Sequence, residues 1–484
     1  MPLSVCVAVA LCAGSLAGGG RPVPVHGWSD AYARSDAHAW SERQTERMAA
    51  DTVIAFVRVG VIPMDAERVL EDQTVLVEGD RILTIGEASG VAVPPEAVVI
   101  DGRGKYLMPG IAEMHAHIPN PLGPGGVEYM ENVLFLYVAR GITTIRGMLG
   151  QPEHLVLRDQ VAAGELLAPR IYTSGPSFNG NTVPNPDIAR SRVIDQKRAG
   201  YDFLKLHPGL SRESYDAIVE TAEEEGITFA GHVSVDVGLE RSLEAGQITI
   251  DHLDGYAEVL VADSVVATGN AGLFGFDLTE DLDEEKIPAV ARATMEAGVW
   301  NVPTQSLLEN ILSLESGEAM ANRPEMRYMP QPMVAAWANR KDEFTSSPGY
   351  SAEKAYWYIE VRRDLIKGLQ DAGAGLLLGS DAPQIFQVPG FSALQELEIL
   401  VEAGLTPYEA LSTGTVNVAV FLDELDVSGT VEVGKVADLI LLSANPLADI
   451  SAVSEREGVM VRGRWVSNEE IEERLEEIAS SYGN

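Results

Sequence analysis

The chain has 484 residues and a formal net charge of −37 at pH 7. A surface this acidic repels phosphate backbones, which argues against nucleic acid as a natural partner. The length is sufficient for one large domain together with a smaller one. Both cysteines, Cys6 and Cys12, lie near the N-terminus, so we expect neither disulfides nor cysteine metal ligands in a processed protein.

Residues 1–20 form a candidate signal peptide. The run L-S-V-C-V-A-V-A-L-C-A-G-S-L-A-G is apolar and has small residues near Ala17, where cleavage would occur. The usual basic region before such a run is missing, since Arg21 is the first positive side chain. We expect a periplasmic or secreted protein if the run is a signal peptide, and a cytoplasmic protein otherwise. No other stretch is long and apolar enough to cross a bilayer, so no integral membrane domain is expected.

The segments 52–108 and 426–467 have the pattern of strands. In the first, T-V-I-A-F-V-R-V-G and Q-T-V-L-V-E-G-D-R-I-L-T-I-G alternate, and Gly79-Asp80 marks a hairpin turn. In the second, G-T-V-E-V-G-K-V-A-D-L-I-L-L is again strand-like. We expect both chain ends to pair into one small composite β-sandwich domain. The acidic stretch at 468–484 is expected to form a solvated C-terminal helix.

Apolar, β-rich runs alternate with helix-period stretches between residues 109 and 425. The clearest helix covers 211–226, with Ser211 as its N-cap and Gly226 as its stop signal. Eight strand–helix units in succession predict an α/β fold with a closed (β/α)8 TIM barrel, whose active site lies at the C-terminal strand ends. The predicted strands are 111–117, 142–146, 170–174, 202–207, 227–232, 248–252, 299–303 and 375–381.

Two longer connections interrupt this alternation, at residues 256–298 and 304–373. The second is helix-like and rich in Met, Tyr and Trp, as in E-K-A-Y-W-Y-I-E. Long connections above a barrel mouth often act as lids or specificity elements. Packing on the outside of the barrel is the equally weighted alternative.

The histidines carry the first chemical signal, because the chain has only 8 of them. His115 and His117 are separated by one residue on a predicted strand, so their side chains point the same way. Two converging imidazoles make half of a transition-metal site. His232, His252 and Asp381 also lie at the ends of predicted strands, and together these five residues form a coherent ligand set for a divalent ion.

Lys205 adds a further candidate ligand, because lysine is scarce in this chain and this one lies within the predicted strand Y-D-F-L-K-L-H. A buried ammonium group is costly and either loses its charge or finds a partner. One interpretation is a neutral or modified amine that serves as a metal ligand. The other is a lysine paired with a nearby carboxylate.

An ordered set of motifs runs over roughly residues 52–467: M-P-G-I-A-E-M-H-A-H, the Lys205 strand, G-H-V, D-H-L, G-S-D-A-P and G-K-V-A-D-L-I-L-L. Together they resemble the amidohydrolase superfamily, and within it the imidazolonepropionase-like and Xaa-Pro-dipeptidase-like branch. The resemblance implies two divalent metal ions, with zinc expected. It implies that His115, His117 and Asp381 hold one ion and that His232 and His252 hold the second. Lys205 matches the position of an N6-carboxylated lysine that bridges both ions.

Hydrolysis follows from such a site, because a divalent ion lowers the pKa of bound water from ~15.7 to about 7 and supplies a metal-bound hydroxide. Asp381 is placed to take the water's proton and pass it to the leaving group. We expect a metal-dependent amidohydrolase that cleaves a small C–N substrate, such as a dipeptide or an N-acyl amino acid. An esterase, lactonase or carbamate hydrolase on the same binuclear site is the alternative. A catalytically inactive binding scaffold is a third class.

Three further residues are candidate substrate contacts. Arg146 could bind a substrate carboxylate through its guanidinium fork, with structural ion pairing as the alternative. His207 shares the face of Lys205 and could line the pocket, or be a structural histidine. Tyr256 follows His252 by four residues and could polarise a carbonyl oxygen. The expected partner is a small-molecule substrate, and self-association into a homo-oligomer stays open.

Overall fold

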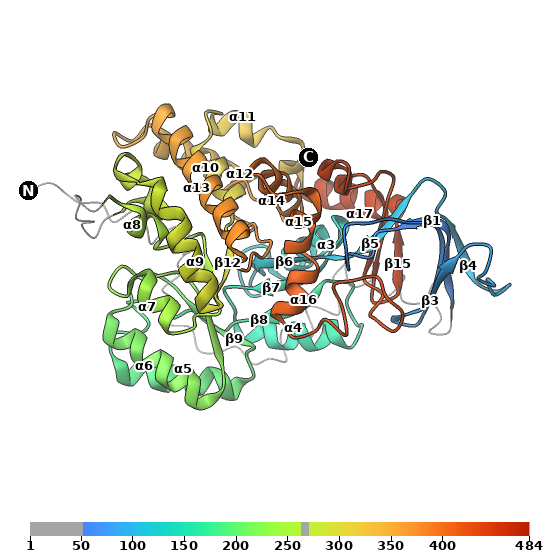
Figure 1. The fold of residues 1–484 in the computed structure, drawn as a ribbon, viewed down its shortest axis with the longest axis horizontal. Helices are drawn as coiled ribbons and strands as arrows, with labels where there is room; N and C mark the ends of the chain where they lie inside the picture. Colours follow the sequence, from blue (N-terminus) through green and yellow to red (C-terminus); the bar gives the residue numbers. More distant parts are fainter. Residues whose placement is uncertain (1–51, 263–270, 484) are drawn as a thin grey trace, which may run out of the picture.

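In the computed structural model, which describes residues 52–262 and 271–483, strands from both ends of the chain share one sheet (Figure 1). The strand order is β15-β14-β13-β5-β1-β2-β3, and β4 pairs with β1 outside this path. Antiparallel pairing of β5 with β13 joins the chain ends and sets Met108 opposite Ile440. These strands are β1 (Ile54–Val61), β2 (Leu70–Glu78), β3 (Arg81–Glu87), β4 (Val98–Asp101), β5 (Tyr106–Pro109), β13 (Leu439–Leu442), β14 (Arg456–Val461) and β15 (Arg464–Ser467).

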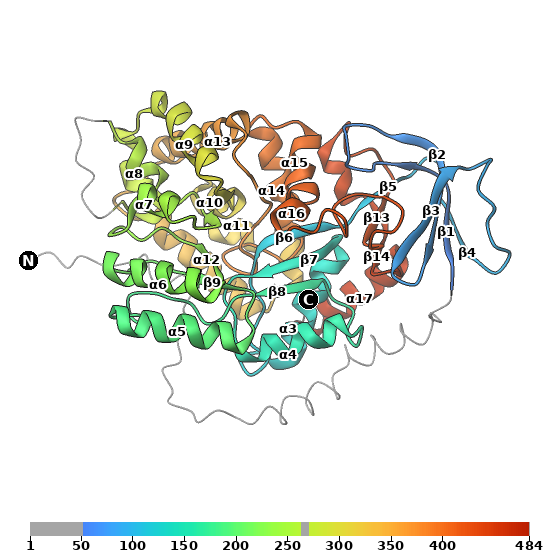
Figure 2. The same cartoon turned by 60° about the horizontal axis from the view of Figure 1, so that its bottom comes forward.

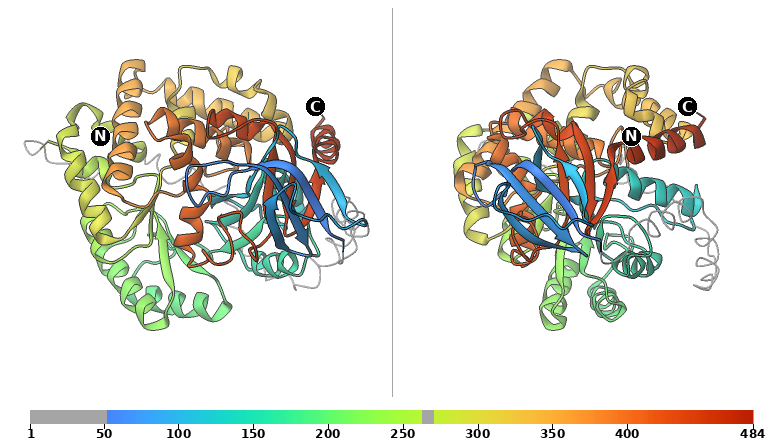
Figure 3. Two further views of the ribbon diagram at one scale, coloured as in Figure 1. Left: turned by 45° about the vertical axis from the view of Figure 1, so that its right-hand side comes forward. Right: turned by 90° about the vertical axis from the view of Figure 1, so that its right-hand side faces the viewer.

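The shared sheet forms because apolar side chains from both chain ends pack together. Phe56, Val75, Leu107, Leu441 and Met460 belong to one buried cluster. The hairpin between β2 and β3 turns at residues 79–80, as the sequence predicted. Figure 3 shows the N-terminal strands in blue beside the C-terminal strands in red. The predicted pairing of the two ends is therefore observed, and the structure assigns these strands to a single sheet.

The predicted central strands are present as parallel strands in two sheets. One sheet contains β6 (Ile111–Ala116), β7 (Ile142–Gly147) and β8 (Arg170–Thr173). The other contains β9 (Phe203–Leu206), β10 (Thr228–Gly231), β11 (Thr249–Asp251) and β12 (Trp300–Val302). A parallel bridge between Ser174 and Phe203 links the two sheets. Figure 2 shows β6, β7 and β8 side by side at the centre of the molecule.

The last predicted strand, 375–381, is not a regular strand in the structure. Leu376 makes one parallel bridge to Asn301 of β12. The Met114 N–H of β6 donates to the Leu378 carbonyl at 2.7 Å, but the Leu378 N–H donates to Thr413 instead of returning to β6. The regular ladder is therefore interrupted at Leu378, although the Asp381 N–H again donates to the His115 carbonyl and the segment links β12 to β6. The strands and this segment form a closed circuit of hydrogen bonds.

Helices follow most of these strands, and the helix predicted over 211–226 is present. In this helix, the Ser211 hydroxyl accepts from the Ser214 N–H and Gly226 takes a left-handed φ of 63° at the C-cap. The helices from this part of the chain are α3 (Gly126–Ala139), α4 (Pro152–Ala162), α5 (Pro186–Ala199), α6 (Arg212–Glu225), α7 (Gly238–Glu244), α8 (Tyr256–Leu260), α9 (Ile287–Ala297), α14 (Phe391–Glu402), α15 (Pro407–Thr413) and α16 (Val416–Phe421).

The two longer connections are also largely helical. The first contains the 3-10 helices η1 (Leu273–Asp281) and η2 (Glu284–Lys286) between α8 and α9. The second contains α10 (Gln305–Leu312), α11 (Gly317–Ala321), η3 (Pro324–Tyr328), α12 (Gln331–Thr345) and α13 (Ala352–Ala372). The long helix α13 packs against α9 and also contacts α10 and η1. It therefore contacts elements that precede β12 in the chain and an element that follows it.

The C-terminal helix α17 (Asn468–Ser481) begins with a capping box between Ser467 and Glu470. It is not fully solvated, because Ile471, Leu475 and Ile478 are buried. The helix packs against α3, where Arg474 donates to Asn132 at 2.8 Å. The acidic residues occupy the other face of an amphipathic helix. A short 3-10 helix, η4 (Ile450–Ser454), lies between β13 and β14.

Within the described ranges, no helix is both long and apolar enough to cross a bilayer. The signal-peptide prediction for residues 1–20, together with Cys6 and Cys12, lies outside the described residues.

Candidate metal centre

Four histidines from three strand ends lie together in the interior. His115 is on β6, His117 follows it, and His232 and His252 follow β10 and β11. The ring centroids are 5.7 Å apart for His115 and His117, 4.6 Å for His115 and His252, and 4.5 Å for His232 and His252. Alternation along β6 explains why its two histidines share one face. Parallel pairing of β10 with β11 brings the other two alongside.

The Asp381 carboxylate lies among these rings. One of its oxygens is 2.5 Å from His117 Nε2 and 3.3 Å from His115 Nε2, and the other is 3.9 Å from His252 Nε2. The Asp381 N–H donates to the His115 carbonyl at 2.9 Å, which fixes this residue to the end of β6. His115, His252 and Asp381 each offer a ligand atom, and these three atoms lie within 4.8 Å of one another.

Lys205 is buried beneath this cluster and forms an ion pair. Its Nζ lies 3.2 Å from Asp251 Oδ2, and both side chains have 0% exposure. Asp251 is also 3.2 Å from His115 Nδ1 and 3.5 Å from an Arg146 amine, and it accepts from the Thr249 hydroxyl at 2.8 Å. Burial acts to raise the pKa of the Asp251 carboxyl, but Lys205, His115 and Arg146 together hold it well below its usual range. In this structure, Lys205 has the carboxylate partner that the second interpretation required.

Asp251 and Glu113 are two buried carboxylates that the predicted site lacked. Glu113 accepts from the Ser380 N–H at 2.7 Å and from the Ser380 hydroxyl at 2.9 Å. Because Ser380 precedes Asp381, these bonds fasten the Asp381 segment to β6. Burial raises the pKa of Glu113 to about 8, against the lowering effect of its hydrogen bonds to Ser380 and His115. The sequence contained a signal for both residues. Glu113 lies two residues before His115 on the same strand and so points to the same face, and Asp251 directly precedes His252.

His252 is held by groups from the long insertion. Its Nδ1 lies 2.8 Å from the Thr304 hydroxyl. Its carbonyl accepts from the buried Arg362 guanidinium of α13 at 2.8 Å, and the same guanidinium donates to Pro303 and Gln305. His252 has a left-handed φ of 62°, a conformation that surrounding contacts must maintain. The insertion therefore supports the site from outside the strands.

Burial sets the protonation of the candidate ligands. It lowers the pKa of His115 to about 4, and the charge of Lys205 acts in the same direction. It also lowers the pKa of His252 well below its usual value, with His232 and His115 adding to the effect. Burial acts to raise the pKa of Asp381, but His115 and His117 outweigh it and keep this carboxyl below its usual range. At neutral pH, His115 and His252 are therefore neutral imidazoles and Asp381 is an ionised carboxylate.

The three candidate substrate contacts occupy different environments. Arg146 is buried and donates to the Met114 carbonyl and to Thr249, in keeping with its structural alternative. The buried Tyr256 hydroxyl bonds to Asn301 and Thr294. His207 stacks on His232 with centroids 4.9 Å apart, and its buried Nδ1 has no hydrogen-bond partner among the described residues. His207 is therefore in contact with a predicted ligand and has an unused polar atom, and Arg146 Nη1 is also without a hydrogen-bond partner among the described residues.

The chemistry of this donor set fits a divalent transition metal. Neutral imidazole and carboxylate are ligands that zinc prefers. In addition, His115, His117 and His252 all turn Nε2 towards the Asp381 carboxylate, at 3.3, 2.5 and 3.9 Å. A shared cation would accept all three nitrogens and the carboxylate as ligands.

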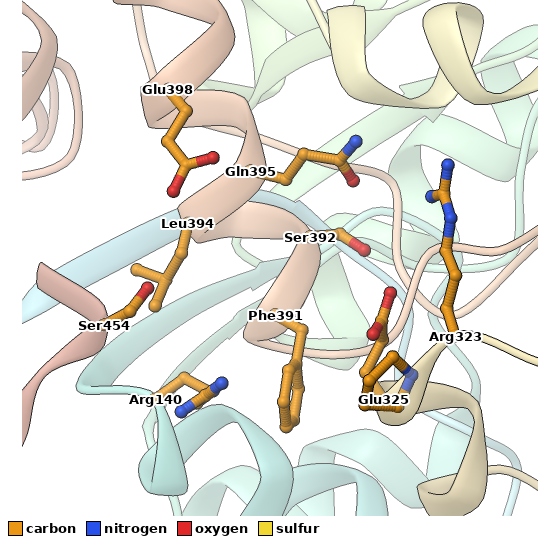
Figure 4. A pocket seen from close by; sticks show the side chains of 10 residues that line it. Arg140, Arg323, Glu325, Phe391, Ser392, Leu394, Gln395, Glu398 and Ser454 are labelled. Carbon is orange, nitrogen blue, oxygen red and sulfur yellow. The ribbon is translucent and has the colours of Figure 1, made fainter. Parts of the chain in front are cut away.

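A surface cavity of about 400 Å³ lies away from this centre (Figure 4). Its lining includes Arg140, Phe391, Glu325 and Glu398, and none of the predicted site residues. The Arg140 guanidinium lies 3.9 Å from the centroid of the Phe391 ring. Both signs of charge line the cavity, so its lining does not select one ligand charge.

Comparisons of the sequence with known proteins identify a matching family and several relatives. The model of the Amidohydrolase family matches residues 106–466. An imidazolonepropionase from Rhizobium rhizogenes is 23% identical over 399 residues, which cover 79% of this chain and 89% of that protein. A 5-methylthioadenosine/S-adenosylhomocysteine deaminase from Caldanaerobacter subterraneus is 25% identical over 412 residues, which cover 80% of this chain and 84% of that protein.

Solved structures give the same picture. A candidate prolidase from Bifidobacterium longum superposes with a TM-score of 0.63 at 26% identity, covering 89% of this chain and 100% of that one. A bottromycin amidohydrolase superposes with a TM-score of 0.69 at 20% identity, and the superposition covers 93% of this chain and 94% of that one. At that lower identity the likeness concerns the fold alone. The resemblance predicted from the motifs is confirmed.

Proposed function

We propose that this chain, which belongs to the amidohydrolase family, is a metal-dependent hydrolase that cleaves the C–N bond of a small amide. Dipeptides and N-acyl amino acids are the proposed substrates. The observation that carries the proposal is the convergence of three imidazoles, those of His115, His117 and His252, on the Asp381 carboxylate, with His232 packed beside His252. Family membership supports hydrolysis in general, and the narrower substrate class rests on likeness to prolidases.

The proposed architecture is that of the sequence prediction. The closed circuit of hydrogen bonds would be the (β/α)8 barrel, over residues 109–425. Residues 52–108 and 426–467 would form the composite β-sandwich domain, followed by the helix at 468–484. In this arrangement, the candidate ligands lie at the C-terminal strand ends, where such barrels carry their active sites.

The proposed ligands divide between two ions, with zinc as the expected metal. His115, His117 and Asp381 would hold one ion, and His232 and His252 the other. An N6-carboxylated Lys205 would bridge them. The Lys205–Asp251 ion pair belongs to the unmodified amine. Carboxylation replaces the positive charge with a negative one, so the modified side chain would no longer attract Asp251.

The chemistry that bound ions supply is acidification of a coordinated water and polarisation of the substrate carbonyl. The chain's own groups prepare for this step. Asp381 is proposed to accept a proton from the attacking water and return it to the leaving amine. Glu113 holds the proposed ligand Asp381 in place through Ser380, and Thr304 contacts the ring of the proposed ligand His252 directly. Support of this kind fixes the orientation of a metal-binding side chain.

Metal content and a substrate panel test the proposal. Zinc-loaded protein would be assayed on dipeptides and N-acyl amino acids alongside aryl esters and lactones. Faster cleavage of the amides supports the proposal, and cleavage of esters or lactones alone would favour the alternative bond class. Protein that binds no metal and hydrolyses none of these compounds would contradict it.

Matched lysine variants test the proposed bridge. Lys205→Met should lower the metal content per chain. The control Lys341→Met alters another buried lysine, which donates to the Ile311 and Ser313 carbonyls away from the cluster. That control should retain full metal content. A carbamate signal in 13C NMR after incubation with labelled bicarbonate should appear in the control and be absent from Lys205→Met.

A further inference from the structure

An aromatic side chain packs on one of the proposed metal ligands. The Phe274 ring stacks on His252, with centroids 5.0 Å apart and an interplanar angle of 26°. Phe274 belongs to η1 and is only partly buried. One face of the ring is therefore used by a proposed metal ligand, while part of the side chain stays exposed beside it.

The backbone at Phe274 is held in an unfavourable conformation. Its φ of 49° and ψ of 29° are left-handed, which is rare for a bulky residue. Such a conformation persists only where surrounding contacts maintain it, and it is often found at functional sites. The contacts around Phe274 identify what maintains it here.

Tyr358 of α13 holds Phe274 in place. Its buried hydroxyl donates to the Phe274 carbonyl. The next residue, Gly275, allows this approach, since a Cβ there would lie 2.3 Å from Ala257 Cβ and 2.8 Å from the Tyr358 oxygen. One turn further along α13, Arg362 donates to the His252 carbonyl. One face of α13 thus positions both the ligand and the ring stacked on it.

We propose that Phe274 is a specificity-determining residue, whose ring selects substrates with a flat apolar group next to the scissile amide. This inference rests on the proposed function and deepens it. An aromatic or broad apolar group of the substrate would bury a large apolar area against the Phe274 ring, whereas a methyl group would bury little. The larger buried area would favour binding of the aromatic substrate. Tyr358 acts through Phe274 and is a positioning residue.

Two matched substrate pairs test the selectivity of zinc-loaded enzyme. N-benzoylglycine and N-acetylglycine compare the acyl side, and glycylphenylalanine and glycylglycine compare the amine side. The wild type should prefer the aromatic member of at least one pair by kcat/KM. Phe274→Ala should reduce that preference by roughly 10- to 100-fold, the scale of discrimination that apolar pockets achieve. Tyr358→Phe should reduce it by a smaller factor.

Controls separate this inference from the proposed function. Phe344→Leu alters a ring that contacts Phe276 and Tyr350 but not His252, and it should leave the preference unchanged. Zinc content should be the same in all variants. An active, zinc-bound Phe274→Ala enzyme with the wild-type preference would overturn the inference and leave the proposed function intact.

A binding measurement covers the case in which none of the four compounds is cleaved. Phenylacetate and acetate would be titrated calorimetrically into zinc-loaded protein. Phenylacetate should bind more tightly to the wild type, and Phe274→Ala should remove most of that advantage. Equal affinities for both anions in the wild type would overturn the inference.

Discussion

The Asp251→Asn substitution should strongly destabilise the metal-free protein. Asp251 has 0% exposure and lies within 3.5 Å of Lys205, His115 and Arg146. The asparagine keeps the shape of the side chain but leaves two buried cations without their anion. Breaking a buried ion pair in this way typically costs about 3–5 kcal/mol in the free energy of unfolding.

Urea unfolding of chelator-treated protein, without added bicarbonate, measures this loss. The folded-state pKa of Asp251 is below the unfolded value, so its stabilising contribution is present above the unfolded pKa of ~3.9. The difference between variant and wild type should therefore persist at neutral pH. It should shrink as the pH falls below about 4, towards the folded-state pKa.

The control is Asp216→Asn, because Asp216 also pairs with two cationic side chains, Arg212 and Arg241, but is 36% exposed. Exposed pairs contribute only about 0–1 kcal/mol. Equal, small losses for both variants would refute the reasoning. Loading with zinc and bicarbonate should shrink the Asp251→Asn penalty if Lys205 becomes carboxylated, since a negatively charged carbamate does not need the negative charge of Asp251 beside it.

Three further outcomes are expected. Asp381→Asn should retain at least part of its bound zinc, measured by elemental analysis, while turnover falls by about 10²–10⁴-fold; full activity would end its role in proton transfer. Thr304→Val removes the partner of His252 Nδ1 and should weaken zinc affinity by about 10–100-fold in a chelator competition, whereas unchanged affinity would show that the hydroxyl does not orient the ring. The pKa of His115 is about 4 in the metal-free protein, so NMR titration should show a neutral ring from pH 8 down to about 5; protonation near the ordinary value of 6.5 would contradict the burial that lowers it.

Much of the fold was predictable because its signals are local. Alternation located β6 and the β2–β3 hairpin, and the Ser211 cap located the start of α6. The segment 375–381 was less accessible to this reasoning. Its apolar pattern is that of a strand, but the Leu378 N–H turns to Thr413, which no local pattern reveals.

The candidate site was predictable to the extent that its residues share a simple rule. Strand ends of one parallel set meet at one edge, so the histidines and Asp381 could be grouped from order and position alone. The supporting groups could not be grouped in this way. Arg362 and Tyr358 lie on a helix far along the chain, and their roles depend on tertiary contacts with His252 and Phe274. The positions of Arg146 and Tyr256 likewise depend on buried partners that spacing does not identify.

The antiparallel pairing of β5 with β13 also constrains how this protein is made. Until the ribosome has synthesised residues 439–442, β5 lacks the neighbour that covers one of its edges. An exposed strand edge readily recruits other chains. Nascent or prematurely terminated polypeptides should therefore be prone to aggregation, and completion of this sheet should be a late event in biogenesis.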